Sequence, residues 1–199
     1  KMQPRGFCSE PPHAWPRLPS LTKCEIHISD LGPENSDVGQ GMNSQKSGFQ
    51  VKDAITTESP GPHGGNMDMP DVGIGSTLYL PVKVPGALLF VGDGHAAQGD
   101  GEVCGSAIEI PTRGRLSVDL IKGRAIASPR LENSDSIMAI GNARPMEDAA
   151  RIAFYELILW LESDYGMDRM MAYQLCSMVA KVRVGNMVDP LYSVGAIFP

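Results

Sequence analysis

The sequence is poor in the features that mark several common classes of protein. Cysteine occurs only four times in 199 residues, at widely separated positions, and no Cys-x-x-Cys pair is present. That spacing argues against a zinc knuckle or a thioredoxin-like redox site and is typical of a reduced, cytoplasmic protein. No run of five like charges occurs, and the formal net charge is only −6. These absences argue against nucleic acid or a charged membrane surface as a partner.

Long apolar runs are also missing. The longest candidates, residues 86–91 and 152–161, fall well short of the roughly 20 apolar residues that span a bilayer, and Glu156 interrupts the second. The first residues do not combine a charged start with an apolar stretch, so the sequence predicts neither a secretory signal nor a membrane partner. Hydrophobic residues still make up 42% of the chain, which is enough to bury a substantial core.

The first third of the chain has little regular pattern. Residues 1–62 hold eight of the sixteen prolines, together with a stretch rich in Gly, Ser and Asn at 39–48. Such a composition rarely supports sustained helix or strand periodicity. Only residues 24–29 alternate apolar and polar side chains as a short strand does. We therefore expect an irregular N-terminal segment over residues 1–60 and one folded domain over residues 61–199.

Strand patterns dominate the middle of the chain. Alternation over residues 78–84 predicts a strand with one buried face, and Pro81 places it at a sheet edge. The apolar run 87–91 predicts a more buried strand. Residues 102–110 and 115–121 predict two more.

Helical patterns follow near the C-terminus. Apolar residues recur at helical spacing over residues 145–165, with Pro and two acids at the start. A second helix is expected to begin after Asp168 as its cap and to run to Gly185. The predicted fold is α+β and β-rich, with a sandwich- or barrel-like sheet core covered by a C-terminal helix pair.

A short loop after the predicted 87–91 strand concentrates ionisable side chains. Residues 92–102 contain two Asp, one Glu and one His among four glycines. Glycines let the main chain approach a ligand closely, while crowded carboxylates and imidazole repel or stay poorly paired unless a cation or a substrate organises them. A turn whose acids only cap the backbone needs fewer such groups. The sequence therefore predicts a divalent metal site in this loop.

A second glycine-rich stretch, residues 61–68, carries another His and Asp.

Four motifs in one order resemble the acetamidase/formamidase family: His63-Gly-Gly-Asn-Met-Asp68, Leu78-Tyr-Leu-Pro-Val82, Gly92-Asp-Gly-His95 and Gln98-Gly-Asp-Gly-Glu-Val103. Residues 118–122 and 183–190 resemble later segments of that family. The similarity covers residues 61–199, whereas the preceding residues do not resemble the longer β-rich N-terminal half typical of the family.

The resemblance implies a function as well as a fold. It implies hydrolysis of small linear amides, such as formamide and acetamide, with release of ammonia and a carboxylic acid. It also implies a β-rich fold built from sandwich and barrel parts with α/β additions. A bound divalent metal, with zinc as the first candidate, and homo-oligomeric assembly are further implications. A small-molecule amide is then the expected partner.

Three side chains are expected to be metal ligands: His63, Asp93 and His95. Neutral imidazole and carboxylate suit zinc and leave the open position that a catalytic site requires. Among the three, Asp93 and His95 are the better-supported pair, because they share one loop.

Two carboxylates are candidates for proton transfer. Glu102 is expected as the general acid/base, with Asp100 as an orienting neighbour or alternative base, because either could move a proton between water and the departing amine. Asn66 and Gln98 could donate to the substrate oxygen. Amides in a glycine-rich turn are equally suited to a structural role.

Two other interpretations fit part of the pattern. The Asp/Gly loop could hold calcium in a noncatalytic interaction module, because oxygen ligands on a flexible loop suit that ion. His95 adds nothing to such an oxygen cage. A cupin-like metalloenzyme would use a His and a Glu from a small β-barrel, but its usual paired histidines are absent around His95.

Overall fold

One antiparallel sheet provides the framework of the protein. The computed structural model describes the backbone of residues 20–27 and all of residues 56–199. The strands are β1 (Ser20–His27), β2 (Ser76–Pro81), β3 (Arg115–Lys122), β4 (Arg130–Glu132), β5 (Ile137–Ala143), β6 (Lys181–Asn186) and β7 (Tyr192–Phe198). They form a seven-stranded sheet in the order β3-β1-β2-β4-β5-β7-β6, in which every neighbouring pair is antiparallel.

Two helices, α1 (Met146–Tyr165) and α2 (Arg169–Val179), connect β5 to β6. Glu147 and Asp148 lie in the first turn of α1, where they face the positive end of the helix dipole, and Gly166 ends the helix in the left-handed conformation with φ 66°. Asp168 caps α2 by accepting from the main-chain N–H groups of Met170 and Met171. None of the helices in the described residues has the length and apolar character of a membrane span.

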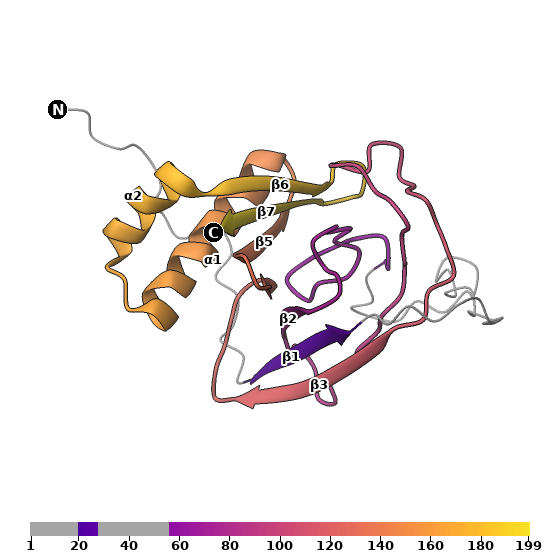
Figure 1. Cartoon of the computed structure of the whole chain (residues 1–199), viewed down its shortest axis with the longest axis horizontal. Coiled ribbons are helices and arrows are strands. Elements are labelled where there is room, and N and C mark those ends of the chain that lie inside the picture. Colours follow the sequence, from indigo (N-terminus) through magenta and orange to yellow (C-terminus); the bar gives the residue numbers. More distant parts are fainter. Residues whose placement is uncertain (1–19, 28–55) are drawn as a thin grey trace.

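The sheet has a core on each face. Along β5, Ile137 and Ala139 face the helices, whereas Met138 and Ile140 face the chain segment 67–72. The helix-side core contains the buried residues Ala153, Leu157, Ile158, Trp160, Leu161, Ala172, Cys176 and Ala196. The opposite core contains Met67, Met69, Leu78 and Leu131. In Figure 1 the helix pair lies beside β5, β6 and β7, and the long loops of residues 82–114 lie at the other end of the molecule. The fold is therefore α+β and β-rich with a helix pair covering the sheet, as predicted.

A buried ion pair fastens β4 to α1. The Nε atom of Arg130 donates to Glu156 Oε1 at 2.9 Å, and both side chains are nearly inaccessible to water. The guanidinium carbon of Arg130 also lies 5.0 Å from the centre of the Trp160 ring. Burial raises the pKa of the Glu156 carboxyl, against the lowering effect of Arg130. Loss of either partner would leave an uncompensated buried charge.

The strands predicted over residues 78–84 and 87–91 need correction. β2 ends at Pro81 and lies between β1 and β4, so its prediction as an edge strand is wrong. Pro81 is accommodated because only Thr77–Tyr79 pair with β4. Residues 87–91 form no strand, since Ala87 and Leu88 have φ of 58° and 52° and no described strand lies beside them. Their side chains are exposed instead of buried.

Two further boundaries differ from the predictions. Most of residues 102–110 is not a strand, because Glu102 and Gly105 turn the chain with φ of 41° and 73°. The second helix ends at Val179, well before the predicted Gly185. Residues 181–186 form β6 because alternating valines suit a pleated strand and pair with β7.

The remaining strand predictions are confirmed in position. β3 occupies the range predicted over residues 115–121, and β1 overlaps the strand predicted over residues 24–29. β1 lies inside the sheet, between β2 and β3, although it comes from the segment predicted as irregular. Residues 1–19 and 28–55 lie outside the described residues, so a domain boundary near residue 60 stays a prediction.

Gly141 on β5 offers a test of the contact between sheet and helix. A Cβ atom there would lie 2.0 Å from the main-chain oxygen of Ala149 on α1, so we expect Gly141→Ala to lower the free energy of unfolding by about 3 kcal/mol. Urea unfolding followed by circular dichroism measures the change. Gly114→Ala is the matched control, because nothing lies within 4 Å of its Cβ position. Equal stability of the two variants would contradict this packing.

Candidate functional site

A short two-stranded ribbon carries the predicted metal-binding loop. Residues 94–97 run antiparallel to residues 107–110. The N–H of Ala96 donates to the Ile108 oxygen at 2.9 Å, and the N–H of Ile110 donates to the Gly94 oxygen at 3.1 Å. A side chain at Gly94 has no room, because its Cβ would lie 2.1 Å from a methyl carbon of Thr112. The ribbon places His95 directly opposite Glu109.

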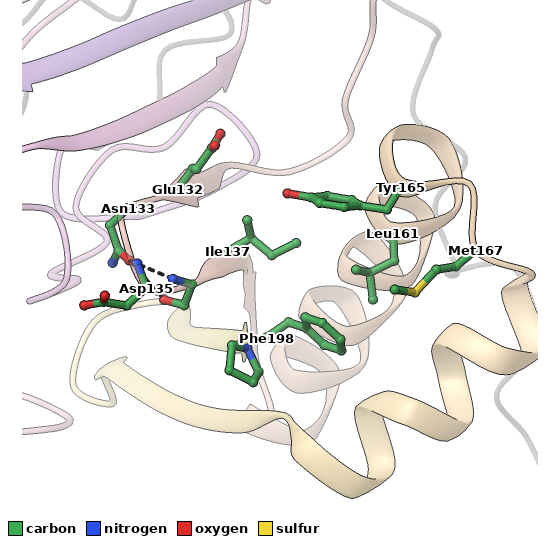
Figure 2. Close-up of a pocket in the computed structure, with 10 residues that line it drawn as sticks. Glu132, Asn133, Asp135, Ile137, Leu161, Tyr165, Met167 and Phe198 are labelled. Atoms are coloured by element: carbon green, nitrogen blue, oxygen red, sulfur yellow. Dashed lines mark hydrogen bonds between the residues drawn. The ribbon is translucent and has the colours of Figure 1, made fainter.

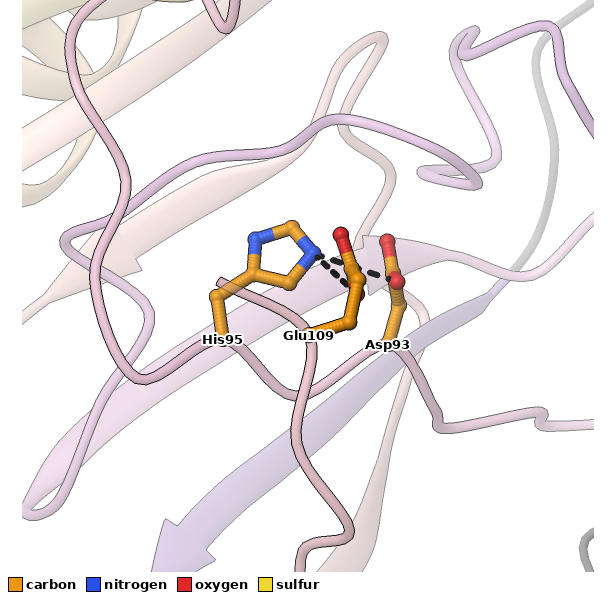
Figure 3. A group of neighbouring side chains, drawn as sticks. All are labelled: Asp93, His95 and Glu109. Atoms are coloured by element: carbon orange, nitrogen blue, oxygen red, sulfur yellow. Dashed lines mark hydrogen bonds and ion pairs between the residues drawn. The ribbon is translucent and has the colours of Figure 1, made fainter. Parts of the chain in front are cut away.

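Three side chains meet at one end of this ribbon. The Nε2 atom of His95 lies 3.2 Å from Asp93 Oδ1 and 3.1 Å from Glu109 Oε2. Figure 3 shows both carboxylates directed at this same ring nitrogen. One potential ligand atom from each residue lies within 4.8 Å of the others. The predicted pair Asp93 and His95 is thus brought together, and Glu109 is added to it.

Gln98 determines which nitrogen of His95 carries the proton. Its Nε2 atom donates to the main-chain oxygens of Asp68 at 2.6 Å and Gly185 at 3.1 Å. The other end of the amide, Oε1, must therefore be an acceptor, and it lies 2.9 Å from His95 Nδ1. The proton of neutral His95 is consequently on Nδ1, and the lone pair of Nε2 points toward the carboxylates.

That arrangement favours a cation at Nε2. A lone pair facing two carboxylates is repulsive unless a proton or a metal ion lies between them. Burial lowers the pKa of His95, but the bond to Gln98 and the charges of Asp93 and Glu109 outweigh burial and raise it. One imidazole nitrogen and two carboxylate oxygens also form a donor set that suits zinc. The residues present therefore fit a divalent metal ion.

Glu102 lies beside this group on a turn anchored to β6. Its Oε1 atom is 3.9 Å from His95 Nε2, and its side chain is only 8% exposed. The preceding residue, Gly101, donates to the Val184 oxygen and accepts from the N–H of Met187, both at 2.9 Å. Burial raises the pKa of the Glu102 carboxyl, against the lowering effects of His95 and a hydrogen bond with Asp68. A raised pKa suits a group that must both take up and release a proton.

Asp68 joins Glu102 to a further acid, Asp189. Burial, a hydrogen bond with Asp189 and the charges of Glu102, Asp189 and Asp93 raise the pKa of Asp68 to about 7. Asp68, Asp93 and Glu102 all have positive φ, at 47°, 64° and 41°. Such conformations are costly for residues other than glycine and gather at functional sites. The raised pKa values of Asp68 and Glu102 let these two carboxyls hold a proton at higher pH than ordinary acids do.

The other predicted site residues lie apart from the imidazole. The ring of His63 packs over Gly61 and Gly65, and His63 is not among the described residues whose ligand atoms converge. Burial and the charge of Lys83 lower the pKa of His63. Asp100 faces β6, where its Oδ1 atom accepts from Arg183 at 2.6 Å.

Two predicted substrate-binding amides are engaged within the protein. Asn66 donates to Asp189 Oδ2 at 2.8 Å. Gln98 has both ends of its amide occupied by His95, Asp68 and Gly185, so it orients the imidazole and is poorly placed to bind substrate.

Sequence reasoning missed Glu109, Asp189 and the part played by Asp68. Glu109 stands between Ile108 and Ile110, an alternation that predicts a strand but does not show which strand lies opposite. Asp68 and Asp189 belong to segments that resemble the family, so the motifs pointed to them without giving them a role. The contact between them links residues far apart in the chain, which local pattern cannot reveal.

A cavity of about 230 Å³ near the end of α1 is a weaker candidate for the site. Leu161, Met167 and Phe198 supply its apolar lining, as Figure 2 shows. Asn133 also lines the cavity, but its side-chain oxygen Oδ1 is already engaged, because it accepts from the N–H groups of Asp135 and Ser136. None of the converging groups described above lines this cavity.

Comparison with known proteins agrees with the motifs. A sequence profile of the Acetamidase/Formamidase family matches residues 22–193. The chain is 47% identical to the acetamidase of Mycolicibacterium smegmatis over 75 residues, which make up 37% of this chain and 18% of that protein. It is 46% identical to the formamidase of Methylophilus methylotrophus over 68 residues, or 33% of this chain and 16% of that protein. The matched parts thus make up less than a fifth of the length of these curated relatives.

Solved structures extend the similarity over nearly the whole chain. An acetamidase from Yersinia enterocolitica superimposes with a TM-score of 0.76 and 37% identity, covering 90% of this chain and 68% of that one. An acetamidase from Bacillus halodurans gives a TM-score of 0.76 at 28% identity, covering 92% of this chain and 74% of that one.

The raised pKa of Asp68 predicts a pH dependence of stability. Because the pKa of Asp68 is about 7 in the folded protein but near the ordinary value of 3.8 in the unfolded chain, the free energy of unfolding should fall as pH rises between these values. Asp68→Asn should flatten this slope. Urea unfolding at about pH 5 and about pH 7, with chelator present, measures it. An unchanged slope in the variant would show that Asp68 is not the group responsible.

Proposed function

The chain belongs to the acetamidase/formamidase family, and from this premise we propose that it hydrolyses small linear amides of the formamide and acetamide kind. The products are ammonia and a carboxylic acid. The observation that carries the proposal is the convergence of Asp93, Glu109 and Glu102 on Nε2 of a single histidine, His95. Predicted homo-oligomeric assembly and a cytoplasmic location stay predictions.

A divalent metal ion, with zinc as the first choice, is part of the proposal. Asp93, His95 and Glu109 would hold it, and His63 is no longer among the ligands because its ring lies over Gly61 and Gly65. When bound, such an ion supplies Lewis acidity, which makes water a better nucleophile and the amide carbonyl more electrophilic. Calcium is disfavoured, because the imidazole nitrogen is a poor ligand for a hard cation.

Glu102 is the proposed general acid/base. Its carboxylate lies close enough to His95 Nε2 to accept a proton from a water molecule that attacks the amide carbon. The same carboxyl then returns that proton to the amide nitrogen as the carbon–nitrogen bond breaks, which gives ammonia. Burial of Glu102 limits competition from bulk water, and its hydrogen bond with Asp68 fixes the carboxyl during both transfers. Asp100 is a poorer base, since Arg183 engages it.

His95 and Glu102 can be separated experimentally. We expect His95→Ala to lose both bound metal and ammonia release, because it removes the central ligand. Glu102→Gln should retain metal but release ammonia about 100- to 10,000-fold more slowly, because it removes only proton transfer. Metal analysis and an ammonia assay with formamide and acetamide measure both effects.

The same substitution at Glu147, an exposed residue of α1, is the matched control for Glu102 and should change neither quantity. Full activity of Glu102→Gln together with loss in Asp100→Asn would reverse the assignment of the base. Bound calcium alone with no amide turnover would favour the noncatalytic interaction module.

Gln98 allows a test of the tautomer argument. Gln98→Met keeps the length of the side chain but removes the acceptor for His95 Nδ1 and the donor to two main-chain oxygens. We expect zinc affinity to fall by about 10- to 100-fold, as is typical when the partner that orients a ligand is lost. Titration with a competing chelator measures the affinity. Gln174→Met, on the exposed side of α2, is the control, and equal affinity in both variants would refute the role of Gln98.

A further inference from the structure

Asn186, the last residue of β6, is completely buried. It lies beside Asp68, the carboxyl that contacts Glu102 and Asp189. Its Nδ2 atom lies 3.1 Å from the main-chain oxygen of Asn66 and 3.1 Å from Asp68 Oδ2. It also lies 3.2 Å from Ser193 Oγ. One amide group therefore contacts the main chain and the side chain of the segment that carries Asp68.

The orientation of this amide is fixed by its neighbours. Ser193 Oγ donates to Asn142 Oδ1 at 2.8 Å, and Asn142 Nδ2 donates to the Gly61 oxygen at 3.0 Å. Because the Ser193 hydroxyl has only one proton, it must accept from Asn186. The Asn66 carbonyl can only accept as well. Asn186 therefore presents its NH₂ group to all three oxygens.

The chain of bonds behind Asn186 is anchored in the sheet. Asn142 pairs with Ser193 across β5 and β7, and Ser193 pairs with Asn186 across β7 and β6. Three adjacent strands thus contribute one polar side chain each at the same level. A donor mounted on such a row has little freedom to move, in contrast to a donor on a loop.

Burial of the carbonyl half of the Asn186 amide is unfavourable for folding. Asn186 Oδ1 is buried and has no hydrogen-bond partner among the described residues. Burying an unpaired carbonyl oxygen is unfavourable, so an apolar residue of similar size would suit the core better if packing were the only requirement. The NH₂ half of the amide must therefore have a role other than filling space in the core.

We propose that Asn186 is a positioning residue that holds the Asp68 carboxyl against Glu102. By donating to Oδ2 of Asp68, the amide restrains the carboxyl that forms hydrogen bonds with Glu102 and Asp189. Asp68 has φ 47°, so its segment benefits from being fixed at the main chain of Asn66 as well. This inference rests on the proposed role of Glu102.

Asn186→Leu and the isosteric Asn186→Asp test the proposal in the 199-residue chain loaded with zinc. We expect kcat for formamide to fall by about 100-fold, since small displacements of a reacting group have effects of this size, while KM changes little. Zinc content should stay unchanged, because Asn186 contacts none of the three ligand candidates. Ser193→Ala is the control: it removes the anchor behind the amide but leaves both bonds toward Asp68 and Asn66, so kcat should fall much less.

A double substitution separates positioning from general destabilisation. If Asn186 acts through the Asp68 carboxyl, Asp68→Asn combined with Asn186→Leu should be no slower than Asp68→Asn alone. Losses of kcat that multiply, or a kcat of Asn186→Asp within about threefold of the native value, would overturn the proposal.

Failure of the proposed function would look different. If the native chain released no ammonia from any amide, urea unfolding midpoints would replace kcat as the measurement. The four proteins compared are the native chain, Asp68→Asn, Asn186→Leu and the double variant. Non-additive midpoints would support the hold of Asn186 on Asp68 without any turnover, and additive midpoints would overturn it.

Discussion

The candidate site depends on the close approach of β6 to the chain at Met67 and Asp68. At Gly185 a Cβ atom would lie 2.6 Å from the main-chain oxygen of Met67, so only glycine allows the two segments to come this near. Gln98 then bonds to main-chain oxygens on both sides of the contact. The turn before Glu102 is fastened to the same strand through Gly101. One strand thus aligns two motifs that are separated by about thirty residues in the sequence.

This arrangement gathers several carboxyl groups around one imidazole. The ion pairs of Arg130 and Arg183 neutralise Glu156, Asp71 and Asp100, which lie away from the imidazole. Around His95, by contrast, three carboxylates, those of Asp93, Glu102 and Glu109, face one imidazole nitrogen. Burial first, and the charges of the neighbouring acids second, raise the pKa values of Asp68 and Glu102. The same crowding favours a divalent cation and keeps protons available for transfer.

The sequence predicted elements whose signals are local. α1 and the cap of α2 were found from helical spacing, from acids in the first turn and from Asp168, all of which act within a few residues. Residues 87–91 have the composition of a strand, but a strand also needs a partner, and partners lie far away in sequence. Dependence on distant partners also explains why the site was predicted only in part. Asp93 and His95 share one loop and were predicted together, whereas Glu109 reaches them only through the pairing of the ribbon.

The ribbon has a consequence for how the protein would hold the proposed metal ion. Its two legs are joined by a few main-chain bonds, and Ile108 and Ile110 leave apolar surface exposed, so it has little stability of its own. Asp93 and His95 lie on one leg and Glu109 on the other. An ion shared between them would act as a cross-link that closes the loop, much as a disulfide does. Chelation would then open this loop locally while the sheet and its two cores stay folded.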